Sequence, residues 1–125
     1  LLAKSDFISV HAPLNAYTEN LFTLDAFKKM KNTAIFINVA RGALVNEQDL
    51  YTALTTDEIA GAALDVLCKE PMDPENPLLK IQDSTRLLIT PHIAWAAKET
   101  RFRVVEEVAE NIRRFQRGDT VNRVY

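Results

Sequence analysis

Four short apolar runs, separated by segments of helical periodicity, constrain the fold of this chain more than any other feature. The runs cover residues 7–10, 34–39, 60–64 and 87–89. Each run is nearly continuous in apolar character rather than alternating, which is typical of parallel strands that helices cover on both faces. Strands that alternate with helices are joined by right-handed crossovers, so the sequence predicts an α/β domain with a doubly wound parallel sheet.

The predicted helices begin at capping residues. The first follows Thr23 and covers about residues 24–31, and the second follows Asn46 and covers about residues 47–56. The third is the longest, ends before Gly118, and carries one apolar face that we expect to be buried. This face consists of Val104, Val105, Val108, Ala109, Ile112 and Phe115.

Composition excludes several classes of protein. With 125 residues, of which 47% are hydrophobic, the chain is predicted to form one domain around a core. A formal net charge of -2 provides no basic surface, so no nucleic-acid partner is expected. The single Cys68 allows neither an internal disulfide nor a zinc cluster, and no metal site is expected. Neither a signal peptide nor a membrane span is recognisable, which predicts a cytoplasmic protein without a membrane partner.

The domain is expected to be incomplete in this chain. The four predicted strands make about half of a doubly wound sheet. The glycine-rich phosphate-binding turn expected after a first strand is missing, because the chain has only Gly42, Gly61 and Gly118. The chain also opens at Leu1 without a methionine. We therefore expect the first half of the sheet to lie upstream of Leu1.

Polar side chains follow each predicted strand. His11 follows the first run, Arg41 the second, Asp65 and Glu70 the third, and His92 the fourth. In an open parallel sheet, ligands bind beyond the carboxyl ends of the strands, so these residues are predicted to outline an active site at one edge. Position alone leaves ordinary alternatives open: a surface ion pair for Arg41, a solvated carboxylate for Glu70, and a hydrogen-bonded loop residue for each histidine.

Several motifs together resemble one enzyme family. They are His11-Ala12-Pro13-Leu14, Asn38-Val39-Ala40-Arg41-Gly42-Ala43-Leu44-Val45, Gly61-Ala62-Ala63-Leu64-Asp65-Val66, Glu70-Pro71 and Pro91-His92-Ile93. In this order and spacing they resemble the C-terminal part of the NAD-dependent D-2-hydroxyacid dehydrogenases. The stretch Ile93-Ala94-Trp95-Ala96 is most similar to the glycerate dehydrogenase (hydroxypyruvate reductase) branch. Ala94 and Asn46 depart from the Gly and Asp that many members have.

The resemblance implies a domain organisation and an activity. Residues 1–125 would be the C-terminal half of a Rossmann-like dinucleotide-binding domain, without its glycine-rich first half and without the substrate domain. The complete enzyme would transfer a hydride between NAD, or NADP, and a small 2-keto or D-2-hydroxy acid of the hydroxypyruvate or glyoxylate type. It would be a homo-oligomer. The chain alone, which lacks the phosphate-binding turn, is expected to be inactive.

The resemblance also assigns roles to residues. Reduction of a keto acid requires an acid, and His92 is suited because imidazole titrates near neutral pH. Glu70 would favour the imidazolium and fix its tautomer, and the planar guanidinium of Arg41 would bind the substrate carboxylate. The implied cofactor-binding residues are His11, Pro13, Thr18, Val39, Ala40, Arg41, Asp65, His92 and Ala94.

The same residues are also compatible with two other functions. Relatives of this family serve as transcriptional corepressors with the same residues, so the chain could be a non-catalytic, dinucleotide-sensing interaction module. A receiver-like domain ranks last, because the acidic cluster that such domains carry after the first strand is not seen. Oxidation of NADH with hydroxypyruvate or glyoxylate distinguishes the enzyme from the interaction module.

Overall fold

The computed structural model describes residues 1–122, which belong to two compact units. The first unit extends from Leu1 to His92, and the second begins at Ile93. The first contains the strands β1 (Phe7–Val10), β2 (Ile35–Asn38), β3 (Gly61–Leu64) and β4 (Leu87–Ile89), the helices α1 (Leu24–Phe27) and α2 (Glu47–Thr55), and the short 3-10 helices η1 (Leu2–Lys4), η2 (Gly42–Leu44) and η3 (Pro77–Lys80). The second contains η4 (Ala94–Ala96) and α3 (Lys98–Gln116).

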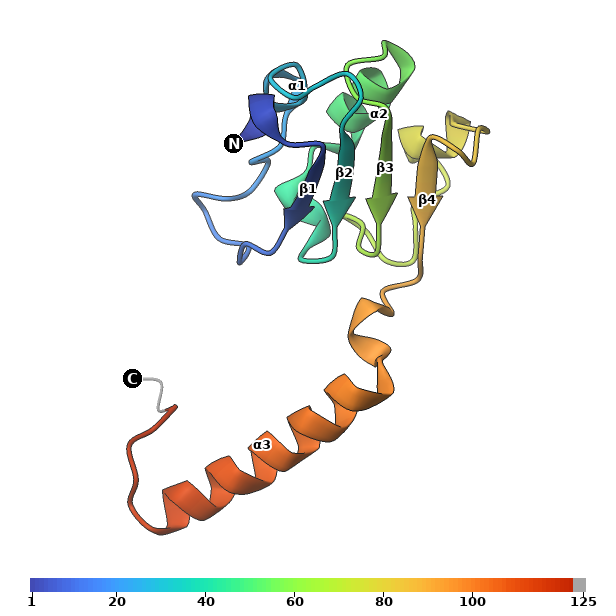
Figure 1. Ribbon diagram of the computed structural model, residues 1–125. Coiled ribbons are helices and arrows are strands. Elements are labelled where there is room, and N and C mark those ends of the chain that lie inside the picture. The colour runs from blue at the N-terminus through green and yellow to red at the C-terminus, as the bar shows by residue number, and fades with distance from the viewer. Residues whose placement is uncertain (123–125) are drawn as a thin grey trace. The chain divides into compact units, whose positions relative to one another are not determined.

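The four strands form one parallel sheet in the order β1-β2-β3-β4 (Figure 1). Across the sheet, Ile8 is paired with Phe36, Phe36 with Ala62, and Ala62 with Leu87. The predicted strands and their parallel arrangement are confirmed. Because all four strands point the same way, the segments that follow them meet at one edge of the sheet.

One face of the sheet carries the core and the other is open. Helices α1 and α2 lie over one face of the sheet (Figure 1). Ile8 and Phe36 of the sheet are buried in one core with Phe27 of α1 and Leu50 of α2. On the opposite face Phe7 is 71% exposed and Leu88 is 59% exposed, so the expected burial of both faces is wrong for the described residues. The reason is topological: the right-handed crossovers from β1 to β2 and from β2 to β3 place both helices on the same side.

The helices begin where polar side chains satisfy their first backbone N–H groups. Helix α1 is shorter than predicted, and Thr23 at its N-cap makes no side-chain capping bond. Instead, the carboxylate of Asp49 in α2 accepts a hydrogen bond from the N–H of Leu24 at 2.9 Å. Helix α2 begins as predicted, because Asn46 Oδ1 accepts from the N–H of Asp49 at 3.0 Å. Asp49 therefore connects the two helices.

Aromatic packing joins these helices to the sheet. The ring centroids of Phe22 and Phe36 are 4.9 Å apart, and Phe27 meets Phe36 edge-on at 5.3 Å. Leu50 of α2 is fully buried in the same core. Edge-to-face aromatic pairs add about 0.5–1.5 kcal/mol each to the burial of their surface. This packing holds β2 firmly, and with it the turn that follows β2.

The second unit is dominated by the 19-residue helix α3. Gly118, with a φ of 82°, ends it as predicted. The expected burial of its apolar face is wrong for the described residues, because Val104, Val108 and Ile112 are 56%, 53% and 55% exposed. Within residues 93–122, the elements other than α3 are the short η4 and the turn after Gly118, which are too small to cover that face. No helix within residues 1–122 is both long enough and apolar enough to cross a membrane.

Candidate active site

The site lies at the carboxyl edge of the sheet in the first unit. His11 follows β1, Arg41 follows β2, Asp65 directly follows β3, and His92 comes three residues after β4. Glu70 belongs to the connection between β3 and η3. Because the strands are parallel, each of these polar residues lies at the carboxyl edge of the sheet, as predicted.

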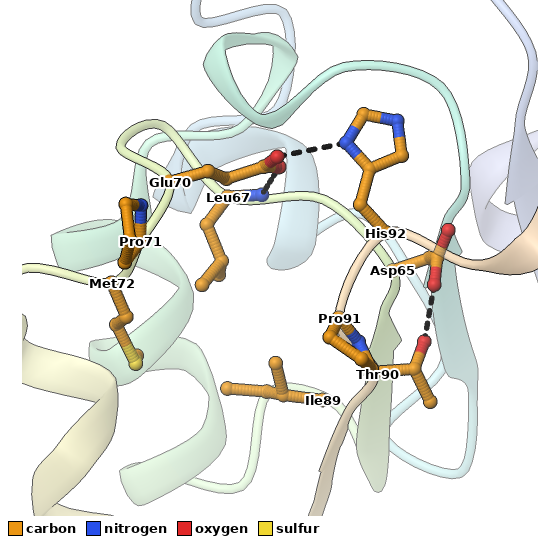
Figure 2. A pocket seen from close by; sticks show the side chains of 9 residues that line it. All are labelled: Asp65, Leu67, Glu70, Pro71, Met72, Ile89, Thr90, Pro91 and His92. Carbon is orange, nitrogen blue, oxygen red and sulfur yellow. Dashed lines mark hydrogen bonds and ion pairs between the residues drawn. The ribbon is translucent and has the colours of Figure 1, made fainter.

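Glu70 and His92 form an ion pair at this edge (Figure 2). The Nδ1 of His92 lies 2.8 Å from Oε2 of Glu70, and the other carboxylate oxygen accepts a hydrogen bond from the N–H of Leu67 at 2.9 Å. The hydrogen bond from His92 and then the one from Leu67 hold the pKa of the Glu70 carboxyl below its ordinary value. The carboxylate is therefore ionised at neutral pH and fixes Nδ1 as the donor nitrogen of the imidazole.

The backbone at His92 is unusual. Its φ is 55°, in the left-handed region that few residues other than glycine adopt. Its N–H donates to the carbonyl oxygen of Thr90 at 3.0 Å, which closes a tight turn over Pro91. Such a conformation costs on the order of 1 kcal/mol and is concentrated at functional sites. The turn places the imidazole of His92 beside the Glu70 carboxylate, with Nδ1 2.8 Å from Oε2.

Asp65 is held rigidly beside this pair. It is only 5% exposed, and the hydroxyl of Thr90 donates a short hydrogen bond to its Oδ1. The N–H of Thr90 in turn donates to the carbonyl oxygen of Leu64 at 2.9 Å. Thr90 is not among the residues predicted for the site, although a polar residue between the fourth apolar run and Pro91 is a recognisable sequence signal.

Arg41 emerges from a turn that a buried asparagine organises. Asn38, at 1% exposure, donates through Nδ2 to the carbonyl oxygen of Arg41 at 2.9 Å and accepts from the N–H of Ala40 at 3.0 Å. The guanidinium of Arg41 is exposed and donates to the carbonyl oxygen of Ala40 at 2.7 Å. Asn38 was also missed; the sequence signal was a polar residue near the end of an apolar strand.

Gly42 brings the Arg41 turn against the Glu70 loop. A Cβ atom at this position would lie 1.9 Å from the carbonyl carbon of Leu67 and 2.4 Å from the nitrogen of Cys68. Only glycine permits this contact between two backbones. As a result Arg41, Glu70 and His92, the three residues predicted to be catalytic, line one cavity of about 280 Å³.

Two further cavities flank this one. Beyond β1 and β2, His11, Pro13, Val39, Ala40 and Arg41 line a cavity of about 560 Å³, together with Ala12 and Leu14. Another cavity has a volume of about 480 Å³, and Glu70, His92 and Asp65 line it together with apolar side chains. Figure 2 shows these side chains. The remaining lining residues of this cavity are Leu67, Pro71, Met72, Ile89, Thr90 and Pro91.

Two residues predicted to bind the cofactor have other places in the structure. The hydroxyl of Thr18 donates to the carbonyl oxygen of Pro13 at 2.7 Å and accepts from the N–H of Asn15 at 2.8 Å, so it shapes the loop after β1. It does not belong to the lining of the 560 Å³ cavity. Ala94 belongs to η4 of the second unit.

Comparison with known proteins decides the family. The NAD binding domain of the D-isomer specific 2-hydroxyacid dehydrogenases matches residues 1–94. The chain belongs to this family. The resemblance inferred from the motifs is thereby confirmed, together with the nicotinamide class of cofactor.

Relatives of this dehydrogenase domain include enzymes of the expected branch. Glyoxylate reductase of Korarchaeum cryptofilum is 44% identical over 95% of this chain, and hydroxypyruvate reductase of Blautia hydrogenotrophica is 42% identical over 98%. The chain spans 35% and 37% of the length of these two relatives. One similar solved structure is a D-isomer specific 2-hydroxyacid dehydrogenase from Xanthobacter autotrophicus in complex with NADPH and MES. The alignment covers 99% of this chain and 50% of that protein's chain, with 36% sequence identity and a TM-score of 0.82. The Rossmann-type fold is confirmed.

Proposed function

We propose that this chain supplies the acid–base residues of an oxidoreductase that interconverts a small 2-keto acid and the D-2-hydroxy acid. The substrate class is that of the named relatives, glyoxylate or hydroxypyruvate. The observation that carries the proposal is the 280 Å³ cavity shared by Arg41, Glu70 and His92, with the Glu70–His92 pair at 2.8 Å. Because the chain spans about a third of those relatives, the activity is proposed for the complete enzyme.

The residues present fit a nicotinamide dinucleotide. A carboxamide donates N–H groups, and the buried carboxylate of Asp65 at the strand edge is a suitable acceptor for them. His11, Pro13, Val39 and Ala40 would hold an adjoining part of the cofactor in the 560 Å³ cavity. The bound cofactor supplies or accepts the hydride at the substrate carbon.

His92 provides the proton of the reaction. Its Nδ1 is held by the Glu70 carboxylate, so Nε2 is the nitrogen that passes a proton to the substrate oxygen during reduction and takes it back during oxidation. The ionised Glu70 stabilises the protonated imidazole and fixes its orientation, as a carboxylate does beside any histidine that acts as acid and base. No other imidazole lines this cavity.

Arg41 binds the substrate. Its guanidinium presents a planar pair of N–H donors that matches a carboxylate, and its charge polarises the neighbouring carbonyl of a 2-keto acid. In the structure the guanidinium donates a hydrogen bond to the carbonyl oxygen of Ala40. To bind a substrate in the 280 Å³ cavity, it would turn away from this oxygen.

The proposal is tested by assaying the complete enzyme that carries this sequence. NADH and NADPH oxidation is followed with glyoxylate, hydroxypyruvate and a control lacking keto acid. The expected result is turnover with at least one of the two keto acids. Tight nucleotide binding without turnover would instead identify the non-catalytic interaction module, for which the exposed apolar surfaces at Phe7 and Leu88 would be the contact region.

A further inference from the structure

The loop that carries Glu70 has little regular structure of its own. Between the end of β3 at Leu64 and the start of η3 at Pro77, the chain forms only bends and turns. Ordering such a segment costs about 1–2 kcal/mol per residue in backbone entropy. Contacts with other elements must therefore hold Glu70 at 2.8 Å from His92.

One carboxylate outside the loop holds it at two points. Glu47 is the first residue of α2, and its Oε1 accepts a hydrogen bond from the N–H of Cys68 at 2.8 Å. Its Oε2 accepts from Nδ2 of Asn76, also at 2.8 Å. Asn76 is buried, and its own Oδ1 accepts from the N–H of Leu78 at 3.0 Å at the start of η3. Glu47 thus connects both sides of Glu70 to a helix packed in the core.

The contacts continue from Glu47 to the imidazole without a break. The peptide between Leu67 and Cys68 lies against the backbone of Gly42, and its N–H donates a hydrogen bond to the carboxylate of Glu47. The N–H of Leu67, on the same short segment, donates to the carboxylate of Glu70 at 2.9 Å. The other oxygen of that carboxylate meets His92. A shift of the Leu67–Cys68 peptide would therefore move Glu70.

We infer that Glu47 is a positioning residue for the Glu70–His92 pair, acting through Cys68 and Asn76 rather than by contact with substrate. The ordinary alternative is that a carboxylate in the first turn of α2 only interacts with the helix dipole. The two roles have different requirements. Interaction with the helix dipole requires only a negative charge near the N-terminus of α2. Holding the loop requires a side chain long enough to bring both carboxylate oxygens within hydrogen-bonding distance of Cys68 and Asn76. The consequence for catalysis rests on the proposed function; the geometric role does not.

Two substitutions separate the roles. Glu47→Gln keeps the length of the side chain but offers only one acceptor oxygen to two donors. Glu47→Asp keeps the charge at the start of α2 but withdraws the carboxylate by one methylene. Glu75→Gln is the matched control, because Glu75 is an exposed carboxylate on the same loop. The hydrogen bonds from Cys68 and Asn76 go to Glu47 and not to Glu75. All three are made in the complete enzyme, and circular dichroism checks that each folds.

The first readout is the titration of Glu70 by carbon NMR of its carboxyl group. Because the lowered pKa of Glu70 depends on its bonds to His92 and Leu67, Glu47→Gln and Glu47→Asp should both raise that pKa toward its ordinary value. Glu75→Gln should leave it unchanged. Charged groups that face this pair are Asp65, which opposes ionisation of Glu70, and Arg41 across the shared cavity; none of the variants alters them.

The second readout is the thiol of Cys68. Although Cys68 is exposed as a residue, partial desolvation of its thiol, and then the charge of Glu47, raise the pKa of Cys68 to about 11. Glu47→Gln should move alkylation of Cys68, followed by peptide mass spectrometry, to lower pH, and Glu75→Gln should not. This readout reports whether the Glu47 carboxylate lies at Cys68 in solution, independently of the state of the active site.

The kinetic expectation is a loss of kcat of roughly 10- to 100-fold in both Glu47 variants, with little change in cofactor affinity. A folded Glu47→Asp enzyme with normal kcat and an unchanged Glu70 pKa would overturn the inference and leave only the helix-dipole role. If the Glu70 pKa moves as expected while His92→Asn retains full turnover, the positioning role stands and the proposed function fails. The two outcomes are therefore distinguishable.

Discussion

At the scale of single residues, Glu70 shows how two hydrogen bonds define the site. His92 donates to one carboxylate oxygen and the backbone N–H of Leu67 to the other, and together they lower the pKa of Glu70. A carboxylate stabilised in this way holds the imidazole in one orientation to more acidic pH than an ordinary glutamate would.

This pairing makes stability depend on pH in a defined direction. The folded pKa of Glu70 lies below its ordinary value of 4.5, so the stabilisation is complete above that value and is lost as the pH falls through the lowered pKa. We expect Glu70→Gln to lower the urea midpoint slightly near neutral pH, because side-chain exposures of 41% and 39% screen the pair. The difference from wild type should vanish in acid. A difference that stays constant across the titration would contradict this account.

At the scale of elements, the sequence predicts where strands and helices lie along the chain better than it predicts which of their faces are buried. The four strands were predictable because a short, continuous apolar run between polar segments is typical of a strand in a parallel sheet. The open face at Phe7 was not, since an apolar side chain looks the same in sequence whether or not a helix covers it. Likewise His92 could be predicted because it follows a strand. Asn38 and Glu47 lie inside predicted elements, where one polar residue near the end of a strand or in the first turn of a helix is a weak signal.

The contact between η2 and the Glu70 loop depends on Gly42. We expect Gly42→Ala to destabilise the fold by about 1–3 kcal/mol or more, because the added methyl group would lie 1.9 Å from a backbone carbon that cannot rotate away. Gly61→Ala is the comparison, since its Cβ would meet a backbone oxygen at 3.1 Å. Urea unfolding of both variants measures the difference, and a smaller loss for Gly42→Ala than for Gly61→Ala would refute the close approach.

At the scale of the whole molecule, both units expose apolar surface. Phe7 and Leu88 are exposed on the sheet, and Val105 and Val108 are 68% and 53% exposed on α3. Exposed apolar surfaces of this kind favour association, and other copies of the same chain are present in any solution of the protein. We therefore expect the 125-residue chain to self-associate at micromolar concentration, with light scattering giving a mass above 14.1 kDa. Leu88→Lys should weaken this association. A stable, monodisperse monomer would show that the exposed faces are not contact surfaces.

In the proposed reaction His92, held by Glu70, supplies the proton for reduction of a 2-keto acid. The most direct test is the turnover of the complete enzyme carrying His92→Asn, with the affinity for NADH measured by fluorescence on the same preparation. We predict that kcat falls by roughly 10²- to 10⁴-fold, because the substitution removes the acid. Cofactor affinity should change little, because His92 does not line the 560 Å³ cavity proposed to hold the cofactor. Near-normal turnover in a folded His92→Asn enzyme would contradict the account.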